Sequence, residues 1–252
     1  MEILVGRNPV LESLCARRRK PRRLFLLEGV REEGVIAALI AAAGAARLQI
    51  QRVMKTELDR LSRQTNHQGV VLETGDYPYA TVPEMVAAAA GAGEPPLFLF
   101  LDLLQDPQNV GTLLRTAEAV GVHGVVLQRR RAVGITPAVV SASSGAVEHL
   151  LVAQETNLTR AMEGLKQDGI WFYGLEATPG ATLYAAADLS GPLGLVVGGE
   201  GTGLRRLVRE TCDVLIRLPM RGRIGSLNAA VAGSVALYAA WQQRRFSGGS
   251  AP

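Results

Sequence analysis

The spacing of apolar residues along the chain follows two periods, one typical of helices and one typical of strands. The stretch LQDPQNVGTLLRTAEAVGVHG, residues 104–124, has the helical period. Asp106 predicts a helix N-cap, and Pro107 suits the first helical position because its missing N–H costs no hydrogen bond there. Apolar residues at i, i+3, i+4 and i+7 predict one buried face, formed by Val110, Leu113, Leu114 and Ala117.

The first part of the chain alternates helical and extended patterns, which predicts a small α/β domain. We expect strands at Arg22–Leu27, Leu48–Val53 and Gly69–Glu73, and helices at Asn8–Leu14, Glu32–Ala46 and Thr56–Gln64. Residues 76–96 then combine Tyr-Pro-Tyr, an alanine-rich piece after Thr81 and a Gly-Ala-Gly-Glu-Pro-Pro run. We interpret them as a linker that holds one short helix.

A second α/β series fills the rest of the chain. Its predicted strands are Leu97–Leu104, Gly124–Leu127, His149–Ala153, Ile170–Leu175, Leu193–Val197 and Val214–Leu218. Helices are expected after Asp106, near Thr136, over Asn157–Gln167, after Gly203 and from Ser226 onward. Because continuous apolar strands alternate with helices, the pattern indicates a mostly parallel sheet covered on both faces.

Charge narrows the class of partner. Of the 252 residues, 48% are hydrophobic and 20% are charged, which is typical of a globular protein, and the net charge is +4 at pH 7. Clustered arginines favour a nucleic acid partner, and solvated surface arginines are the alternative. The clusters are Arg17–Lys20, Arg129–Arg131, Arg205 with Arg206, and Arg221 with Arg223.

Several classes of site have no support in the sequence. Cys15 and Cys212 lie far apart and form no C-x-x-C pair, so we expect neither a disulfide framework nor a zinc site, which suits a reducing cytoplasm. The three histidines share no ligand spacing, and we treat them as structural and expect no metal. Residues 1–10 do not have the pattern of a secretory leader, and the alanine-rich Val35–Ala46 is too short to span a bilayer.

The segment GGEGTG, Gly198–Gly203, lies between a predicted strand and a predicted helix. Its spacing is not the G-x-G-x-x-G fingerprint of dinucleotide-binding proteins. A tight turn that needs glycine at positive φ explains the segment as well as a ligand site does. Glu200 favours the ligand site, because a carboxylate among glycines needs a partner.

The stretch LPMRGRIGSLNAAVAGSVALYAAW, residues 218–241, predicts a strand end, a basic loop and a helix capped by Ser226. That helix is apolar on nearly every side, so we expect it to be buried. Burial inside one chain and burial against a second copy are equally compatible with its small residues.

Three stretches together resemble the motifs of the SpoU family of S-adenosylmethionine-dependent RNA ribose 2′-O-methyltransferases, in the knotted SPOUT superfamily. They are DPQNVGTLLRTAEAVG, LGLVVGGEGTGL and LPMRGRIGSLNAAVA, and their order, spacing and position near the chain end all agree with the family. Toward the N-terminus, GRNPVLESL and HQGVV resemble the subgroup that methylates a guanosine of 23S ribosomal RNA. The resemblance covers essentially the whole chain.

This resemblance implies a fold that periodicity cannot show. It implies a ribosomal-protein-L30e-like RNA-binding domain over residues 1–75, a linker over 76–96, and a SPOUT methyltransferase domain over 97–252 whose parallel sheet ends in a C-terminal trefoil knot. It also implies a homodimer through the knotted domain, S-adenosylmethionine as methyl donor and large-subunit ribosomal RNA as partner.

The resemblance also implies the site residues. The methyl donor is expected at Gly198, Gly199, Glu200, Leu218, Met220, Ser226 and Leu227. The residues associated with catalysis are Asn109, Arg115, Glu200, Ser226 and Asn228.

Family accounts make Arg115 the group that activates the ribose hydroxyl. Because a guanidinium is effectively always protonated, we favour Arg115 as a fixed cation that stabilises the developing alkoxide, rather than as a proton acceptor. Glu200 and Asn109 are expected to orient the guanidinium and the ribose, and Ser226 and Asn228 to order the donor loop.

Other functions stay open at this point. A non-catalytic RNA-binding protein would use the same basic clusters and front domain. The same chemistry could act on tRNA or on another ribosomal RNA site. A Rossmann dehydrogenase is the weakest alternative, because its fingerprint spacing is absent.

Overall fold

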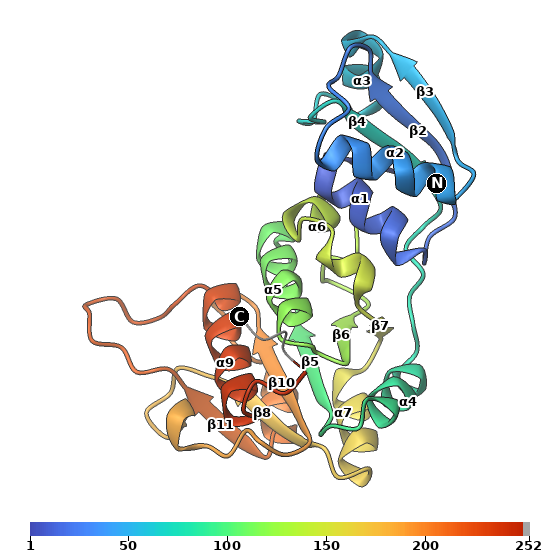
Figure 1. Cartoon of the computed structure of the whole chain (residues 1–252). Helices are drawn as coiled ribbons and strands as arrows, with labels where there is room; N and C mark the ends of the chain where they lie inside the picture. Colours follow the sequence, from blue (N-terminus) through green and yellow to red (C-terminus); the bar gives the residue numbers. More distant parts are fainter. Residues whose placement is uncertain (249–252) are drawn as a thin grey trace. The chain divides into compact units, whose positions relative to one another are not determined.

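The computed structural model describes residues 1–248, so residues 249–252, the end of the expected second domain, lie outside the described part of the chain. The chain divides into two compact units (Figure 1). The first unit contains Met1–Pro78 together with Ile135–His149, and the second begins with Tyr79–Gly134 and resumes at Leu150. The segment Ile135–His149, which the sequence placed in the second domain, thus belongs to the first unit.

The first unit contains a four-stranded sheet in the order β1-β4-β2-β3. Strands β2 and β3 are parallel, and β4 runs antiparallel to β1 and β2. The three predicted strands are confirmed, whereas the four-residue β1 was not predicted because it is too short for a period to show. The elements are β1 (Glu2–Val5), α1 (Arg7–Ala16), β2 (Pro21–Leu27), α2 (Val35–Ala45), β3 (Gln49–Val53), α3 (Lys55–Leu61) and β4 (Val70–Thr74).

A buried ion pair joins the segment Ile135–His149 to the rest of the first unit. The segment forms α6 (Pro137–Ala142) and the 3-10 helix η1 (Ala146–His149), so the strand expected to begin at His149 is wrong there. Both carboxylate oxygens of Glu148 accept from Nε of Arg19 at 2.9 Å, and Arg19 also donates to Glu2 at 2.6 Å. The side chains of Arg19 and Glu148 are each 1% exposed.

The neighbours of Arg19 stabilise the charged form of its guanidinium. Burial by itself lowers the pKa of the guanidinium, but the hydrogen bonds and charges of Glu148 and Glu2 outweigh burial, and the pKa is raised. Arg19 therefore has a structural role inside the first unit, and it is not an exposed member of the Arg17–Lys20 cluster.

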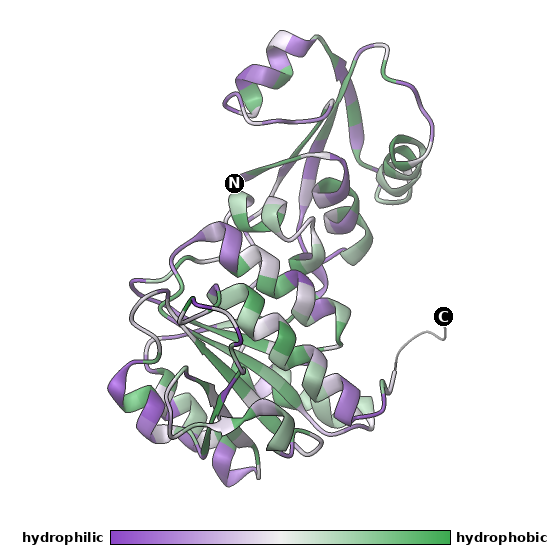
Figure 2. Cartoon of the chain, turned by 90° about the vertical axis from the view of Figure 1, so that its left-hand side faces the viewer, coloured by the Kyte–Doolittle hydropathy of each residue, from purple (hydrophilic) through white to green (hydrophobic). Residues whose placement is uncertain are grey.

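The second unit contains a seven-stranded sheet in the order β7-β6-β5-β10-β8-β11-β9, and every neighbouring pair is parallel. The predicted parallel sheet is therefore confirmed. Its strands are strongly hydrophobic (Figure 2), as expected for a sheet buried on both faces. They are β5 (Leu97–Asp102), β6 (Gly124–Gln128), β7 (Val152–Glu155), β8 (Trp171–Leu175), β9 (Thr182–Leu183), β10 (Leu193–Gly198) and β11 (Val214–Arg217).

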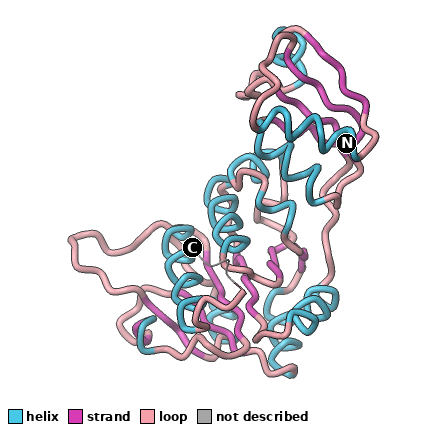
Figure 3. Tube along the Cα trace, in the orientation of Figure 1, coloured by secondary structure: helices cyan, strands magenta, loops and turns pink. Residues whose placement is uncertain are grey.

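Helices pack on both faces of this sheet, and they alternate with its strands along the chain (Figure 3). Helices α4 (Val82–Ala92), α7 (Leu158–Gln167) and α8 (Arg206–Thr211) share one core with Phe100 and Phe172, whose rings meet edge to face at 5.1 Å. Helices α5 (Pro107–Ala119) and α9 (Ala229–Gln243) pack against each other, and a Cβ added at Gly233 of α9 would lie 2.8 Å from Leu113 and 3.1 Å from Val197 of β10. A short 3-10 helix η2 (Tyr184–Ala186) follows β9.

The stretch interpreted as a linker with one short helix contains α4, so the helix is confirmed. Thr81 and Glu84 form a capping box at its start, and Met85 and Ala89 are buried in the core of the second unit. The middle of residues 76–96 is therefore a packed helix, with Ala80 bridging to Ala153 beside β7.

The amphipathic helix after Asp106 forms as predicted. The Asp106 carboxylate accepts hydrogen bonds from the backbone N–H groups of Gln108 and Asn109, and Pro107 is the first residue of α5. All four residues of the predicted stripe are buried: Val110, Leu113, Leu114 and Ala117.

The histidines have protein partners. His67 accepts from the N–H of Gly69 at 2.9 Å, His123 accepts from the N–H of Leu97 at 3.0 Å, and His149 bonds to Glu12 at 2.8 Å. Within residues 1–248, no group of three or more histidine, cysteine, aspartate or glutamate residues has the geometry of a metal site. In the same range, no helix has the length and apolarity needed to cross a membrane.

Candidate functional site

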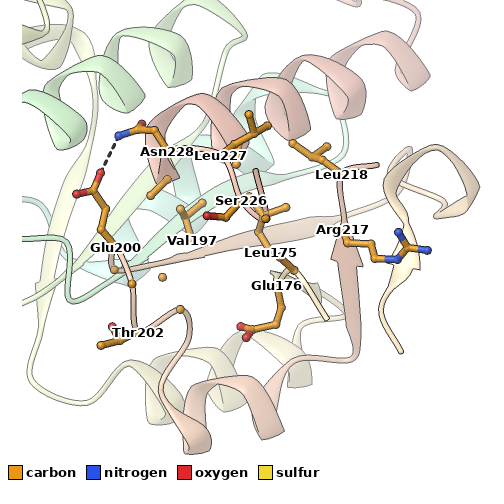
Figure 4. A pocket seen from close by; sticks show the side chains of 18 of the residues that line it. Leu175, Glu176, Val197, Glu200, Thr202, Arg217, Leu218, Ser226, Leu227 and Asn228 are labelled. Carbon is orange, nitrogen blue, oxygen red and sulfur yellow. Dashed lines mark hydrogen bonds between the residues drawn. The ribbon is translucent and has the colours of Figure 1, made fainter. Parts of the chain in front are cut away.

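A cavity of about 490 Å³ opens at the carboxyl ends of strands β8, β10 and β11, where ligands bind in open parallel sheets (Figure 4). Its walls come from the ends of these strands, the glycine loop after β10, and the loop that leads to α9. Glu200 and Asn228 lie at one end in the view of Figure 4, and Leu218 lies toward the other, with Glu176 between them. The cavity thus has a polar end at Glu200 and Asn228, and Leu218 lies with Arg217 toward the other end.

Backbone packing shapes the glycine loop Gly198–Gly203. A Cβ added at Gly198 would lie 2.3 Å from the carbonyl carbon of Gly203, closer than any real contact. Gly201 and Gly203 have φ angles of 75° and 62°, and the N–H of Gly203 donates to the carbonyl of Gly199 at 3.0 Å. The turn interpretation of this segment is confirmed, and the same turn forms a wall of the cavity.

One side chain, that of Asn228, joins the three sequence motifs. Its amide nitrogen donates to Oε1 of Glu200 at 2.7 Å and to Oδ1 of Asn109 at 2.9 Å. Asn109 in turn donates to Oε1 of Glu200 at 2.6 Å. Because three polar groups from the start of α5, the glycine loop and the start of α9 satisfy one another, each limits the orientation of the others.

Asn228 is also the N-cap of α9, so the predicted cap at Ser226 is wrong. The Oδ1 atom of Asn228 accepts from the N–H groups of Ala230 at 2.9 Å and Val231 at 3.2 Å, and the helix begins at Ala229. Ser226 lies two residues earlier, in the loop that lines the cavity. Both residue types cap helices well, and the three-dimensional position of Asn109 and Glu200 decides which one does.

A buried carboxylate anchors the far end of the glycine loop. Asp102, at the end of β5, is fully buried and accepts from the backbone N–H of Arg205 at 2.9 Å and from its Nε at 2.6 Å. Arg205 also donates to Gln128 at 3.0 Å. Charge-assisted bonds to a buried aspartate fix the point where the loop enters α8.

The structure brings together most of the residues expected at the site. Arg115 does not line the cavity and is exposed on α5, and Asn109 is linked to the cavity through its bonds to Glu200 and Asn228. The residues that line the cavity are Gly198, Gly199, Glu200, Leu218, Met220, Ser226, Leu227 and Asn228.

The four arginine clusters differ in what their side chains contact. Arg18 donates to the hydroxyl of Tyr77 at 3.1 Å, and Arg206 pairs with Glu210 at 2.9 Å. Together with Arg19 and Arg205, these contacts give members of two clusters a structural role, whereas Arg17 and Lys20 are exposed. The side chains of Arg129–Arg131 and of Arg221 and Arg223 are exposed.

Sequence reasoning missed Glu176, which lines the cavity directly after β8. Its carboxylate accepts from the N–H of Leu204 at 3.3 Å, and a Cβ at Gly203 would lie 3.2 Å from both of its oxygens. The available signal was its position, since the first polar residue after a buried parallel strand lies at the edge where ligands bind.

The cavity has the properties that S-adenosylmethionine requires. Leu175, Val197, Leu218 and Leu227 supply apolar surface for a purine, and the glycine loop lets backbone groups approach a ligand closely. The carboxylates of Glu176 and Glu200 complement the positive charge of a sulfonium compound.

Comparison with known proteins identifies similar chains. Residues 96–238 match the model of the SpoU rRNA Methylase family, and residues 3–80 match the model of an RNA 2′-O ribose methyltransferase substrate binding domain. A Bacillus subtilis (strain 168) protein named as a TrmH family tRNA/rRNA methyltransferase, YacO, is 42% identical over 243 residues, which are 96% of each chain.

Two solved structures have a similar fold. The SpoU methyltransferase AviRb from Streptomyces viridochromogenes, in complex with AdoMet, aligns with a TM-score of 0.79 at 22% identity over 97% of this chain and 91% of that chain. An AdoMet-bound rRNA methyltransferase from Sinorhizobium meliloti aligns with a TM-score of 0.77 at 23% identity over 96% of this chain and 87% of that chain. At these identities the likeness concerns the fold.

The packing at Gly198 generates a prediction. We expect Gly198→Ala to displace the glycine loop, to lower the free energy of unfolding by about 1–3 kcal/mol and to weaken binding of S-adenosylmethionine, because the new methyl group overlaps the backbone of Gly203. Thermal unfolding and titration calorimetry measure the two effects. The control is Gly164→Ala on α7, where the added Cβ meets nothing within 4 Å. Unchanged donor binding in Gly198→Ala would contradict the prediction.

Proposed function

Since the chain belongs to the SpoU rRNA methylase family and is an RNA methyltransferase whose methyl donor is S-adenosylmethionine, we propose that it methylates the ribose 2′-hydroxyl of a guanosine in 23S ribosomal RNA. The observation that carries the proposed methyl transfer is the junction of Asn109, Glu200 and Asn228 at the end of a cavity of suitable size, and the choice of 23S ribosomal RNA rests on the resemblance of the N-terminal segments. The proposed substrate gives the enzyme a cytoplasmic location.

The donor supplies an activated methyl group for an in-line transfer. On the protein side, we propose that Gly198, Gly199, Glu200, Leu218, Met220, Ser226 and Leu227 bind the donor. Asn228 holds the loop that contains Ser226 and Leu227, because it bonds at the same time to Asn109, to Glu200 and to the start of α9. A held loop aligns the methyl group with the incoming oxygen without further ordering.

On the acceptor side, Arg115 is the proposed positioned cation. It lies on α5, six residues after Asn109, and a permanently charged guanidinium stabilises negative charge that develops on the ribose oxygen. Glu200 and Asn109 fix the polar end of the cavity where the hydroxyl must arrive. Ser226 lies in the donor loop, where its hydroxyl helps to order that loop.

The RNA is proposed to contact both units. The first unit matches a substrate-binding domain model over residues 3–80, which supports a role in RNA binding. In the second unit, the exposed arginines Arg129–Arg131 are tied to the segment before α5, because Gln105 donates to the carbonyl of Arg131 and Val133 donates to that of Leu104, both at 3.0 Å. Arginines held in this way are suited to bind phosphates near the acceptor nucleotide.

We also propose the family's homodimer and trefoil knot. Val231, Val235 and Tyr238 form an exposed apolar stripe on α9, with exposures of 47%, 40% and 48%. A groove of about 380 Å³ runs beside it. Such a stripe is suited to pack against a second copy.

The proposed trefoil knot requires the C-terminal segment to be threaded through a loop of the chain. The position of β10 between β5 and β8 supports such a threaded segment. Tracing residues 170–248 in an experimental structure tests the threading.

The substrate is tested by mapping 2′-O-methyl groups in cells with and without the protein. We expect one guanosine of 23S ribosomal RNA to lose its methyl group when the protein is absent. Both ribosomal RNA and tRNA are mapped, because the relative from Bacillus subtilis is named for either substrate. A change confined to tRNA would overturn the substrate and leave the chemistry intact, and an unchanged map of both RNAs would overturn the proposal.

The role of Arg115 is tested by Arg115→Lys, which keeps the charge and loses the planar fork. We expect turnover to fall about 10²- to 10³-fold, with donor affinity unchanged. Single-turnover methyl transfer and calorimetry separate the two quantities. Arg160→Lys, at an exposed position on α7, is the control. Turnover near that of the wild type would count against a geometric role.

The dimer is tested by sedimentation. We expect the wild type to sediment at twice the chain mass of 26.8 kDa and Val235→Asp to sediment as a monomer, because a buried carboxylate in an apolar interface has no partner. Leu207→Asp, at a residue 57% exposed on α8, is the matched control. A monomeric wild type would refute the dimer.

A further inference from the structure

Glu176 has hydrogen-bonding capacity that the protein does not use. A carboxylate has about four acceptor positions. Within residues 1–248, the hydrogen bond donated to its side chain is the one from the N–H of Leu204, at 3.3 Å. The remaining capacity lies in a residue that lines the cavity and whose side chain lies toward the glycine loop in Figure 4.

The surrounding backbone holds Glu176 in this position. Its own N–H donates to the carbonyl of Ile216 on β11 at 2.9 Å. Gly203 leaves space for the carboxylate, because a side chain there would begin 3.2 Å from both of its oxygens. The backbone of Glu176 is therefore held by β11, and its carboxylate lies against the glycine loop at the cavity wall.

The order of chemistry along the cavity indicates which part of the donor meets Glu176. The methyl group must lie near Glu200 and Asn228, since the acceptor hydroxyl is expected there. The purine is suited to the apolar surface of Leu218, which lies toward the other end of the cavity in Figure 4. The ribose joins the purine to the sulfonium carbon, so it falls between these two ends, where Glu176 lies in Figure 4.

We infer that Glu176 binds the donor by accepting hydrogen bonds from its two ribose hydroxyls. In dinucleotide-binding proteins an acidic residue likewise accepts a hydrogen bond from a ribose hydroxyl. The two oxygens of one carboxylate can accept from two neighbouring hydroxyls. This inference rests on the proposed donor site and deepens it. The residue is a binding residue, and it fixes the middle of the donor while Asn228 fixes the loop over its reactive end.

Comparing three ligands distinguishes a contact with the ribose from contacts with the other groups of the donor. S-adenosylmethionine and S-adenosylhomocysteine share the ribose and the amino acid, but only the first carries the sulfonium charge. The neutral 5′-methylthioadenosine keeps the ribose and lacks the amino acid. A contact with the ribose must therefore affect all three ligands by the same factor.

The test is titration calorimetry of the three ligands with Glu176→Gln and Glu176→Ala. The glutamine variant keeps an oxygen for the N–H of Leu204, so the loop is expected to keep its conformation. We expect the dissociation constants of all three ligands to rise about 10- to 100-fold in the alanine variant and by a smaller common factor in the glutamine variant. Glu163→Gln, at an exposed position on α7, is the control for the change of charge.

The outcomes distinguish this inference from the proposed function. Weakening of S-adenosylmethionine alone would overturn the inference in favour of a sulfonium contact. Weakening of both amino-acid-bearing ligands with unchanged 5′-methylthioadenosine would overturn it in favour of an ammonium contact. Unchanged binding of all three in folded variants would also overturn it. Failure of the wild type to bind S-adenosylmethionine would instead overturn the donor site.

Discussion

The site depends on the amide of Asn228. Its oxygen completes the first turn of α9, and its nitrogen bonds to Asn109 at the start of α5 and to Glu200 in the glycine loop. Residues 109, 200 and 228 lie far apart in the sequence, so each must be delivered by the fold. The amide has both a donor and an acceptor end, and a serine at this position could not reach both the helix and the two polar partners in the same way.

The parallel sheet brings these side chains together because the carboxyl ends of its strands lie at one edge of the sheet. Strands β5 and β10 are neighbours, and the last residues of both carry the site's anchors: Asp102 fixes Arg205, and Gly198 begins the glycine loop. Gly198 lies against the backbone of Gly203, where any side chain would overlap it, so no residue other than glycine fits at the end of β10 without moving the loop. The amphipathic helix α5 and the apolar helix α9 pack on one face of the sheet, and Gly233 of α9 lies close to Leu113 of α5 and Val197 of β10.

Local patterns were sufficient for much of the fold and insufficient for the contacts between distant segments. The Asp106 cap, the buried stripe of α5 and the parallel sheet follow from periodicity and end signals. The α9 cap does not, since Ser226 and Asn228 have nearly equal propensities and the choice depends on Asn109 and Glu200. The short helix expected in the linker is α4, but the Gly and Pro residues around it did not indicate that Met85 and Ala89 supply core contacts.

Charge was the least predictable property. Arg19, Arg205 and Arg206 belong to runs that look alike in the sequence, yet they bind Glu148, Asp102 and Glu210. Their partners lie 129, 103 and 4 residues away, and only the last distance is local. Glu176 is the opposite case. It belongs to no charged run or motif in the sequence, yet its position directly after β8 places it in the cavity wall.

The pair of Arg19 and Glu148 sets the order in which the chain can finish folding during synthesis. When residue 78 has emerged from the ribosome, the first sheet is complete and Arg19 can pair with Glu2, but α6 and η1 have not emerged and Arg19 still lacks Glu148. Strands β5 and β6 and helix α5 must then emerge before Glu148 does. The smallest piece of chain that contains the whole first unit therefore also contains the beginning of the second, and the two units are not separable at any single peptide bond.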